Sequence, residues 1–325
     1  MAEDGPKPSP DLLYAPHGAP GQFFNPWAPF RSRFTDLLRW KLGGKNRYDK
    51  SAPLDIPVVA NDGAYLKQRS APDSVTWIGH SSFAVQDGGE VFLTDPHFGA
   101  RALLPRRKSP PGIPLGAVPA DAFAVLSHNH YDHLDAWSVR HLPAAMPWFV
   151  PLGLGGFFRE RGRQVTELDW WQSVRFGEHG RWTLTCLPAQ HWSNRVTVKR
   201  NATLWCSWLL DSGTRSYYFA GDSGYFDGFA EIGRRFPGID VAFLPIGAYE
   251  PRWFMRAQHA DPGEAYRAFL DLGARTMIPM HWGCFDLTDE PVDLAPKVLA
   301  QVLERSGADR GRVRTLAVGE RWSPW

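Results

Sequence analysis

Short apolar stretches that end in a histidine or an aspartate recur along this chain, and they limit its fold more than any other feature. Each stretch has the length and the β-branched or aromatic content of a strand, and a turn follows it. In α/β sheets, ionisable side chains at the carboxyl ends of strands gather at one edge and form a site there. The sequence therefore predicts a site built on the strand ends of residues 122–128, 183–191, 216–222 and 276–281.

Strands dominate the first half of the predicted structure, and helices alternate with strands in the second half. The clearest helix spans residues 261–273, because Asp261 can cap it, Pro262 suits its first position and Gly273 ends it. This order of elements is typical of the α/β class. Further strands are expected at 75–80, 81–86, 90–96, 147–153, 165–171, 203–210 and 241–247, and further helices at 135–142, 153–161, 225–236 and 295–305.

The first 70 residues differ from the remainder and are interpreted as an N-terminal extension to a domain that spans 71–325. Residues 1 to about 25 are rich in Pro and Gly, so we expect irregular structure there. In residues 31–44, apolar side chains recur at helical spacing with basic ones between them. This amphipathic helix either touches a membrane surface or packs on the main domain. Residues 101–114 are expected to form a long basic loop.

Composition narrows the possible partners. Net charge is +2, which provides no general attraction for nucleic acid. The 15 Trp and 20 Phe make an apolar ligand plausible, although most of these rings must belong to the core. Three unpaired cysteines, no signal peptide and no apolar run of about 20 residues favour a cytoplasmic protein with at most peripheral contact with the inner face of a membrane. The sequence does not predict an oligomeric state.

The sequence LSHNHYDHLD at residues 126–135 concentrates four ionisable side chains. His128 and His130 lie two residues apart, so they face the same side of an extended backbone. Asp132 and His133 follow as the chain turns toward a helix. Imidazole and carboxylate ligands suit zinc, although iron or manganese is compatible with them. Four ligands on so short a loop fit two adjacent ions better than one. The other strand ends offer further ligands, namely His191, Asp222 and His281.

These residues, in this order, resemble the metallo-β-lactamase superfamily. Within it the chain is most similar to the N-acylphosphatidylethanolamine-hydrolysing phospholipase D family, from about residue 22 to near the end. The resemblance implies a four-layer αβ/βα sandwich, two zinc ions and cleavage of a phosphodiester to an N-acylethanolamine and phosphatidic acid. The motifs that carry it are WIGHSSF, FLTDPHFGARA, LSHNHYDHLD, WFVPLGLG, ELDWW, PAQHW, LWCSW, FAGDSGY, LPIGAYEPRWFM and MHWG.

The resemblance also implies a role for each ligand. Asp222 bridges the two ions, and Asp132 and Asp222 therefore belong to the catalytic centre as well as to the metal site. Zinc supplies Lewis acidity and lowers the pKa of bound water toward neutrality. One ion is assigned to His128, His130 and His191, and the other to Asp132, His133 and His281.

Three further side chains are candidates for the site. Asp95 and His80 follow neighbouring strands and could orient the ligands. Their alternatives are an ordinary turn aspartate and a structural histidine. His259 matches a family histidine near the reacting phosphate, and it could orient the substrate or protonate the leaving group. Its alternative is helix capping or packing.

Three functions remain open at this stage. The first is a zinc phosphodiesterase that acts on N-acylated phospholipids. The second is a lactonase or other ester hydrolase on the same metal pair, because one fold hosts many reactions. The third is a nucleic-acid-processing protein of the superfamily, which the balanced charge and the absence of a basic domain oppose.

Overall fold

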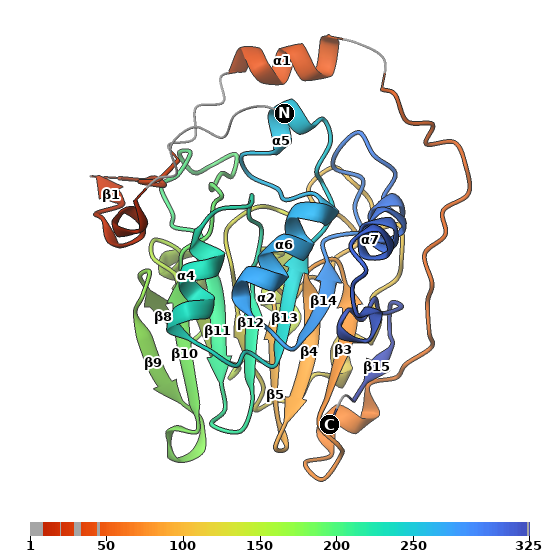
Figure 1. Cartoon of the computed structure of the whole chain (residues 1–325). Helices are drawn as coiled ribbons and strands as arrows, with labels where there is room; N and C mark the ends of the chain where they lie inside the picture. Colours follow the sequence, from red (N-terminus) through yellow and green to blue (C-terminus); the bar gives the residue numbers. More distant parts are fainter. Residues whose placement is uncertain (1–8, 20, 29–33, 44–45, 324) are drawn as a thin grey trace.

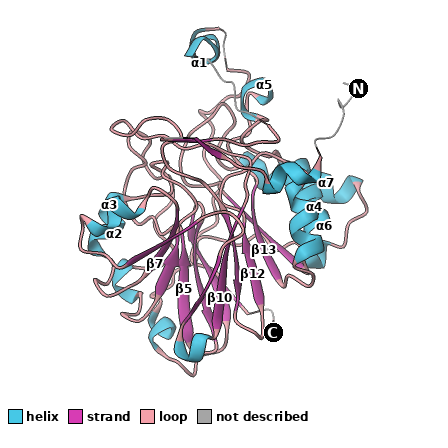
Figure 2. Cartoon of the chain, turned by 90° about the vertical axis from the view of Figure 1, so that its left-hand side faces the viewer, coloured by secondary structure: helices cyan, strands magenta, loops and turns pink. Residues whose placement is uncertain are grey.

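A computed structural model describes residues 9–19, 21–28, 34–43, 46–323 and 325. Two mixed sheets face each other and helices cover their outer faces, so the predicted αβ/βα sandwich is confirmed. Figure 2 shows α2 and α3 outside one sheet and α4, α6 and α7 outside the other.

The first sheet has seven strands, in which β3, β4 and β5 form an antiparallel meander and β5 to β8 are parallel. Its strands in spatial order are β15 (Arg321–Trp322), β3 (Ser74–Gly79), β4 (Ser82–Asp87), β5 (Glu90–Thr94), β6 (Phe123–Val125), β7 (Trp148–Pro151) and β8 (Val165–Leu168).

The second sheet has six strands, of which β9 to β12 are antiparallel and β12 to β14 parallel. Its strands in spatial order are β14 (Thr276–Met280), β13 (Val241–Pro245), β12 (Ser216–Phe219), β11 (Ser207–Asp211), β10 (Trp182–Leu187) and β9 (Ser173–Phe176). The expected strand at 203–210 begins only at residue 207, because the amides of Leu204 and Cys206 donate to the carbonyls of Leu152 and Ser127 instead of to a strand of this sheet.

The helices lie close to their predicted ranges. In α6 the expected cap forms: Asp261 accepts hydrogen bonds from the amides of Gly263 and Glu264, and Gly273 ends the helix in the left-handed conformation. The helices are α1 (Phe34–Leu42), α2 (Ala136–His141), α3 (Gly155–Arg159), α4 (Gly228–Arg235), α5 (Arg252–Met255), α6 (Pro262–Leu272) and α7 (Leu294–Arg305); the short 3-10 helices are η1 (Pro10–Tyr14), η2 (Ala64–Lys67), η3 (Leu115–Ala117), η4 (Glu178–Gly180) and η5 (Arg310–Arg312).

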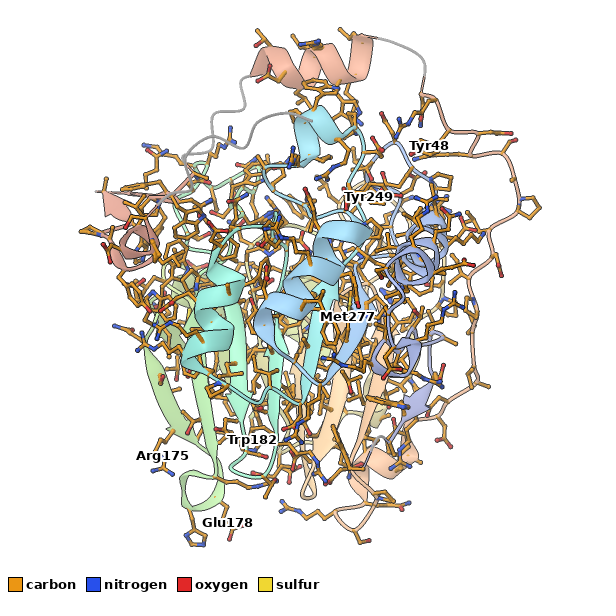
Figure 3. The ribbon with its side chains drawn as sticks, viewed as in Figure 1. Tyr48, Arg175, Glu178, Trp182, Tyr249 and Met277 are labelled. Carbon is orange, nitrogen blue, oxygen red and sulfur yellow. The ribbon has the colours of Figure 1, made fainter. Side chains whose placement is uncertain are left out.

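Alternation along the strands divides the core into two layers. Phe83 and Phe92 point between the sheets, where they meet Phe243 and Trp182 of the second sheet. Ala84 and other residues of opposite parity point outward and pack under α2 and α3. Trp182 is labelled low in the sandwich in Figure 3, and the space around it is filled by side chains. Most of the unusual aromatic content is therefore core.

The N-terminal residues pack on the sandwich. Irregular structure is expected up to about residue 25, but the described part contains η1 and a hairpin of β1 (Gly18–Ala19) and β2 (Gln22–Phe23). The predicted helix in 31–44 is confirmed as α1, and residues 31–33 and 44 lie outside the described part. Figure 1 shows α1 over α5 at the edge where the site lies.

One basic side chain of the loop at residues 101–114 binds the protein itself. The Arg107 guanidinium donates to the carbonyls of Ile78, His97 and Ser109. It therefore stabilises the loop, whereas its neighbours Arg106 and Lys108 are exposed.

Candidate metal centre

The chain places all of the predicted ligands at one edge of the sandwich, in loops that follow strand ends. The His128 to His133 loop follows β6, and β10, β12 and β14 lead to the remaining ligands. The strands are held by the core, whereas the polar loops lie beyond it, so a rigid scaffold carries the site. The side chains that meet there are His128, His130, Asp132, His133, His191, Asp222 and His281.

One cluster consists of His128, His130, His191 and Asp222. The Nδ1 of His130 lies 2.8 Å from Nε2 of His128 and 3.1 Å from Nε2 of His191. Both Nε2 atoms lie 3.8 Å from Oδ2 of Asp222. Four potential ligand atoms therefore converge on one point.

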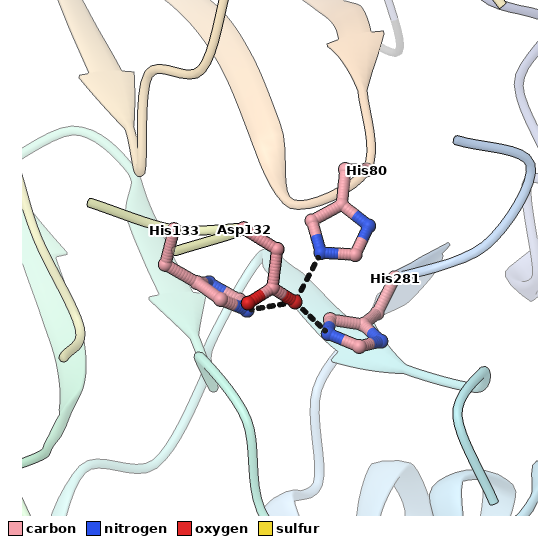
Figure 4. A group of neighbouring side chains, drawn as sticks. All are labelled: His80, Asp132, His133 and His281. Carbon is pink, nitrogen blue, oxygen red and sulfur yellow. Dashed lines mark hydrogen bonds and ion pairs between the residues drawn. The ribbon is translucent and has the colours of Figure 1, made fainter. Parts of the chain in front are cut away.

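The second cluster consists of Asp132, His133, His281 and His80. Figure 4 shows the Asp132 carboxylate at its centre. Oδ2 of Asp132 lies 3.5 Å from Nε2 of His133 and 3.4 Å from Nε2 of His281. Nε2 of His80 donates a 3.0 Å hydrogen bond to the same oxygen. His80 thus orients the Asp132 carboxylate toward the two imidazoles.

Asp222 joins the two clusters. Besides its contacts with the first cluster, its Oδ2 lies 3.1 Å from Nε2 of His133, and its Oδ1 lies 3.1 Å from Nε2 of His281. This carboxylate is buried, and in the described part of the chain its Oδ1 has no hydrogen-bond partner. Its position matches the bridging role that the resemblance implies.

The donor set fits divalent metal ions. Nε2 of His133 and Nε2 of His281 are buried and, within the described ranges, accept or donate no hydrogen bond. Such unpaired atoms are costly unless an ion binds them. Ligands of a tetrahedral zinc at roughly 2.0–2.1 Å lie about 3.3 Å from one another, close to the spacings in both clusters.

Outer hydrogen bonds fix the ring orientation of three ligands. The Nδ1–H of His133 donates to Oδ2 of Asp95 over 2.6 Å, and the Nδ1–H of His191 donates to the Gln258 carbonyl over 2.9 Å. The Nδ1–H of His128 donates to the Ser127 hydroxyl over 2.9 Å, and this hydroxyl donates to Asp95 over 2.5 Å. A proton on Nδ1 leaves the Nε2 lone pair free to bind a metal.

Electrostatics at the site follow from burial and from the carboxylates. Burial lowers the pKa of His130 to about 3 and that of His191 to about 4, so both rings stay neutral, as ligands must be. Burial opposes charge on Asp222, but His133 and His281 hold its pKa well below the usual range. Burial likewise opposes charge on His281, yet Asp222 and Asp132 raise its pKa to about 9. A bound cation would take the place of the protons that neutralise these carboxylates.

A cavity of about 640 Å³ opens onto both clusters. His259 lines it, and its buried Nδ1 lies 4.0 Å from Oδ2 of Asp222. No hydrogen-bond partner for this atom lies in the described part of the chain. Burial holds the pKa of His259 well below its ordinary value, against the effect of Asp222. His259 is therefore a neutral side chain that faces both the ligands and the cavity.

Sequence reasoning missed two contributors. Ser127 occurs directly before His128, and a hydroxyl at that position was the available signal. Gln258 acts through its main-chain carbonyl, which no side-chain pattern can indicate.

Comparisons with known proteins agree with this architecture. Residues 90–282 match the family described as "Beta-lactamase superfamily domain". A metallo hydrolase structure from the archaeon Ignicoccus hospitalis superimposes with a TM-score of 0.60 at 22% identity, over 78% of this chain and 98% of that one. At this identity the likeness concerns the fold alone.

Curated sequences are more similar. N-acyl-phosphatidylethanolamine-hydrolyzing phospholipase D 1 of Caenorhabditis elegans is 40% identical over 68% of this chain and 67% of its own length. The mitochondrial N-acyl-phosphatidylethanolamine-hydrolyzing phospholipase D of Saccharomyces cerevisiae is 35% identical over 80% of this chain and 57% of its own length. The chain is a metal-dependent hydrolase and belongs to the N-acyl-phosphatidylethanolamine-hydrolyzing phospholipase D family of the metallo-β-lactamase superfamily.

Proposed function

We propose that this protein is a zinc-dependent phosphodiesterase of the phospholipase D type, which converts an N-acylphosphatidylethanolamine into an N-acylethanolamine and phosphatidic acid. The observation that carries the proposal is the cavity, which has the two ligand clusters at its base and apolar side chains on its walls. Such a cavity suits a substrate with a phosphodiester next to long acyl chains. The names of the worm and yeast relatives support the same substrate.

The proposed metal set follows the two clusters. His128, His130 and His191 hold one zinc ion, and Asp132, His133 and His281 hold the other, with Asp222 shared. Zinc would supply Lewis acidity and a water of lowered pKa. The protein would orient these ligands from outside through Asp95 and His80.

The cavity walls would position the lipid. Trp192 and Tyr131 lie near the clusters, and the guanidinium of Arg200 lies 4.6 Å from the Trp192 ring. Cationic side chains on this wall favour an anionic phosphodiester. The apolar part of the wall, which would receive the acyl chains, consists of Leu37, Leu103, Leu104, Phe254, Met255 and Leu287.

His259 would act on the phosphate. As a neutral imidazole with its unpaired Nδ1 toward the clusters, it can donate a hydrogen bond to a phosphate oxygen. Low basicity favours this orienting role over delivery of a proton to the leaving group.

The rim of the cavity would meet a membrane surface. Leu104 is 77% exposed and Leu42 is 79% exposed, although both are large apolar side chains. Arg39 and Lys41 of α1 lie close to Leu42 in sequence, and their cationic groups lie over the rings of Trp253 and Trp40. Apolar side chains with flanking cations suit the boundary of an anionic bilayer. None of the described helices is long and apolar enough to span a bilayer.

Isotope labelling tests the reaction. In the proposed hydrolysis, the bond between phosphorus and the ethanolamide oxygen breaks, the water oxygen joins phosphorus, and a proton ends on the released alcohol. Zinc-loaded protein in ¹⁸O-water should place the label in the phosphate of phosphatidic acid. Label in the alcohol, or free fatty acid as the main product, would show attack at carbon and support the ester-hydrolase alternative.

A further inference from the structure

Asn25, far from the site in sequence, is buried against the backbone of a proposed metal ligand. It follows β2 and is only 2% exposed. Its Nδ2 donates a 3.0 Å hydrogen bond to the main-chain carbonyl of His191. Its Oδ1 accepts a 3.1 Å hydrogen bond from the Trp205 indole, which also donates to the Ala189 carbonyl over 2.9 Å. Asn25 and Trp205 therefore hold the chain on both sides of Gln190.

Trp27 adds a second contact from the same segment. Its indole donates a 3.2 Å hydrogen bond to Oε1 of Gln190, and its ring stacks on Phe226 with centroids 5.1 Å apart. The Nε2 of Gln190 in turn donates to the Ala257 carbonyl over 3.2 Å. Gln190 thus connects the N-terminal segment to the loop that carries His259.

These contacts lie beyond the end of the regular ladder. Strand β10 ends at Leu187, and an isolated bridge between Gln190 and Gly224 pairs the backbone just before His191. The main-chain carbonyl of His191 itself lies outside this bridge and accepts from Asn25. The ring of His191 is oriented by the Gln258 carbonyl, but that bond cannot fix the main chain that carries the ring. The bond from Asn25 restrains that main chain directly.

We propose that Asn25, supported by Trp27, is a positioning residue for His191 and thereby determines how tightly the His128, His130 and His191 site holds its metal. This inference rests on the proposed metal set and not on the substrate. Loss of an outer hydrogen bond to a metal ligand typically weakens metal binding by about 10–100-fold. Because Asn25 acts through the backbone, we expect about tenfold.

Stepwise zinc titration against a chromophoric chelator tests the proposal. Asn25→Ala removes the contact, and Asn25→Asp keeps the shape but loses the Nδ2 donor. Both variants should weaken one zinc step about tenfold and leave the other step unchanged, and excess zinc should restore activity. Asn61→Ala is the matched control, because the Asn61 side chain also donates to a main-chain carbonyl, that of Gly319 over 2.8 Å, away from the site. It should leave both zinc steps unchanged.

The outcomes distinguish failure of the positioning role of Asn25 from failure of the proposed metal set. Wild-type zinc steps in both Asn25 variants, with only a lower melting temperature, would overturn the positioning role. If neither variant folds, Trp27→Phe decides, because it keeps an aromatic ring next to Phe226 and loses the indole donor to Gln190. Zinc steps of Trp27→Phe equal to wild type would then mean that the segment serves folding alone. Wild-type protein that binds fewer than two zinc ions would instead refute the metal set.

Discussion

The change of Asp95 to Asn tests how far a buried carboxylate controls the proposed metal centre. Asp95 is fully enclosed, and its Oδ1 accepts from the Ser127 amide over 2.7 Å. Its Oδ2 accepts from both His133 and the Ser127 hydroxyl. The carboxylate is therefore the acceptor in each of these hydrogen bonds. The NH₂ group of a carboxamide cannot accept one, so asparagine can satisfy only part of them.

Either orientation of the new amide creates a conflict. If its oxygen faces the Ser127 amide, its NH₂ opposes the Nδ1–H of His133, which must move its proton to Nε2 and lose the lone pair for zinc. If the amide flips, its NH₂ opposes the Ser127 amide. The first case predicts a loss of zinc affinity of about 10–100-fold, or about 1.4–2.8 kcal/mol. The second case predicts a loss of stability of about 1–3 kcal/mol from unpaired buried groups.

Zinc titration and denaturant unfolding of the zinc-free protein separate these cases. Asp135→Asn is the matched control: Asp135 caps α2 by accepting from the amides of Trp137 and Ser138, and it hydrogen-bonds to none of the proposed ligands. It should alter stability without altering zinc binding. Wild-type zinc affinity together with wild-type stability in Asp95→Asn would refute the reasoning, because each orientation of the amide predicts one of these two losses.

Three further predictions follow from the site and its rim. Zinc at 100 times its dissociation constant should raise the free energy of unfolding by about 2.7 kcal/mol for each site; a chelator that leaves the melting temperature unchanged would contradict tight binding. His259→Ala should lower turnover with zinc content intact, whereas His130→Ala should lower both, as metal analysis and product assays would show. The double change of Leu103 and Leu104 to Asp should weaken co-sedimentation with anionic vesicles at least tenfold, because each buried leucine contributes about 1.5–3 kcal/mol; Leu270→Asp, at a leucine of α6 that is also exposed, should have no effect.

Local sequence signals predicted the parts of the structure that depend on local chemistry. The strand β4 and the cap of α6 depend on neighbouring residues, and both were predicted from the sequence. Contacts between distant segments carried no such signal. Asn25 meets His191 across 166 positions, and a basic side chain such as Arg107 has the same appearance in sequence whether it faces water or backbone carbonyls. The strands β6, β10, β12 and β14 belong to two sheets, yet the candidate ligands that follow them meet at one edge of the sandwich, where the sites of α/β folds gather.

Three of the described non-glycine residues with a positive φ directly follow strands that lead to the site. His80, Asp95 and His281 each have a positive φ, at 56°, 32° and 64°. Non-glycine residues in this region cost about 1–3 kcal/mol each and persist only where their surroundings impose the conformation. Here the strands β3, β5 and β14 end just before these residues and are anchored in the core between the sheets. The core therefore stabilises turns that the side chains at the site would not adopt by themselves. A glycine at any of the three positions would relieve the strain and remove the side chain that the metal centre uses, so stability and function oppose each other there.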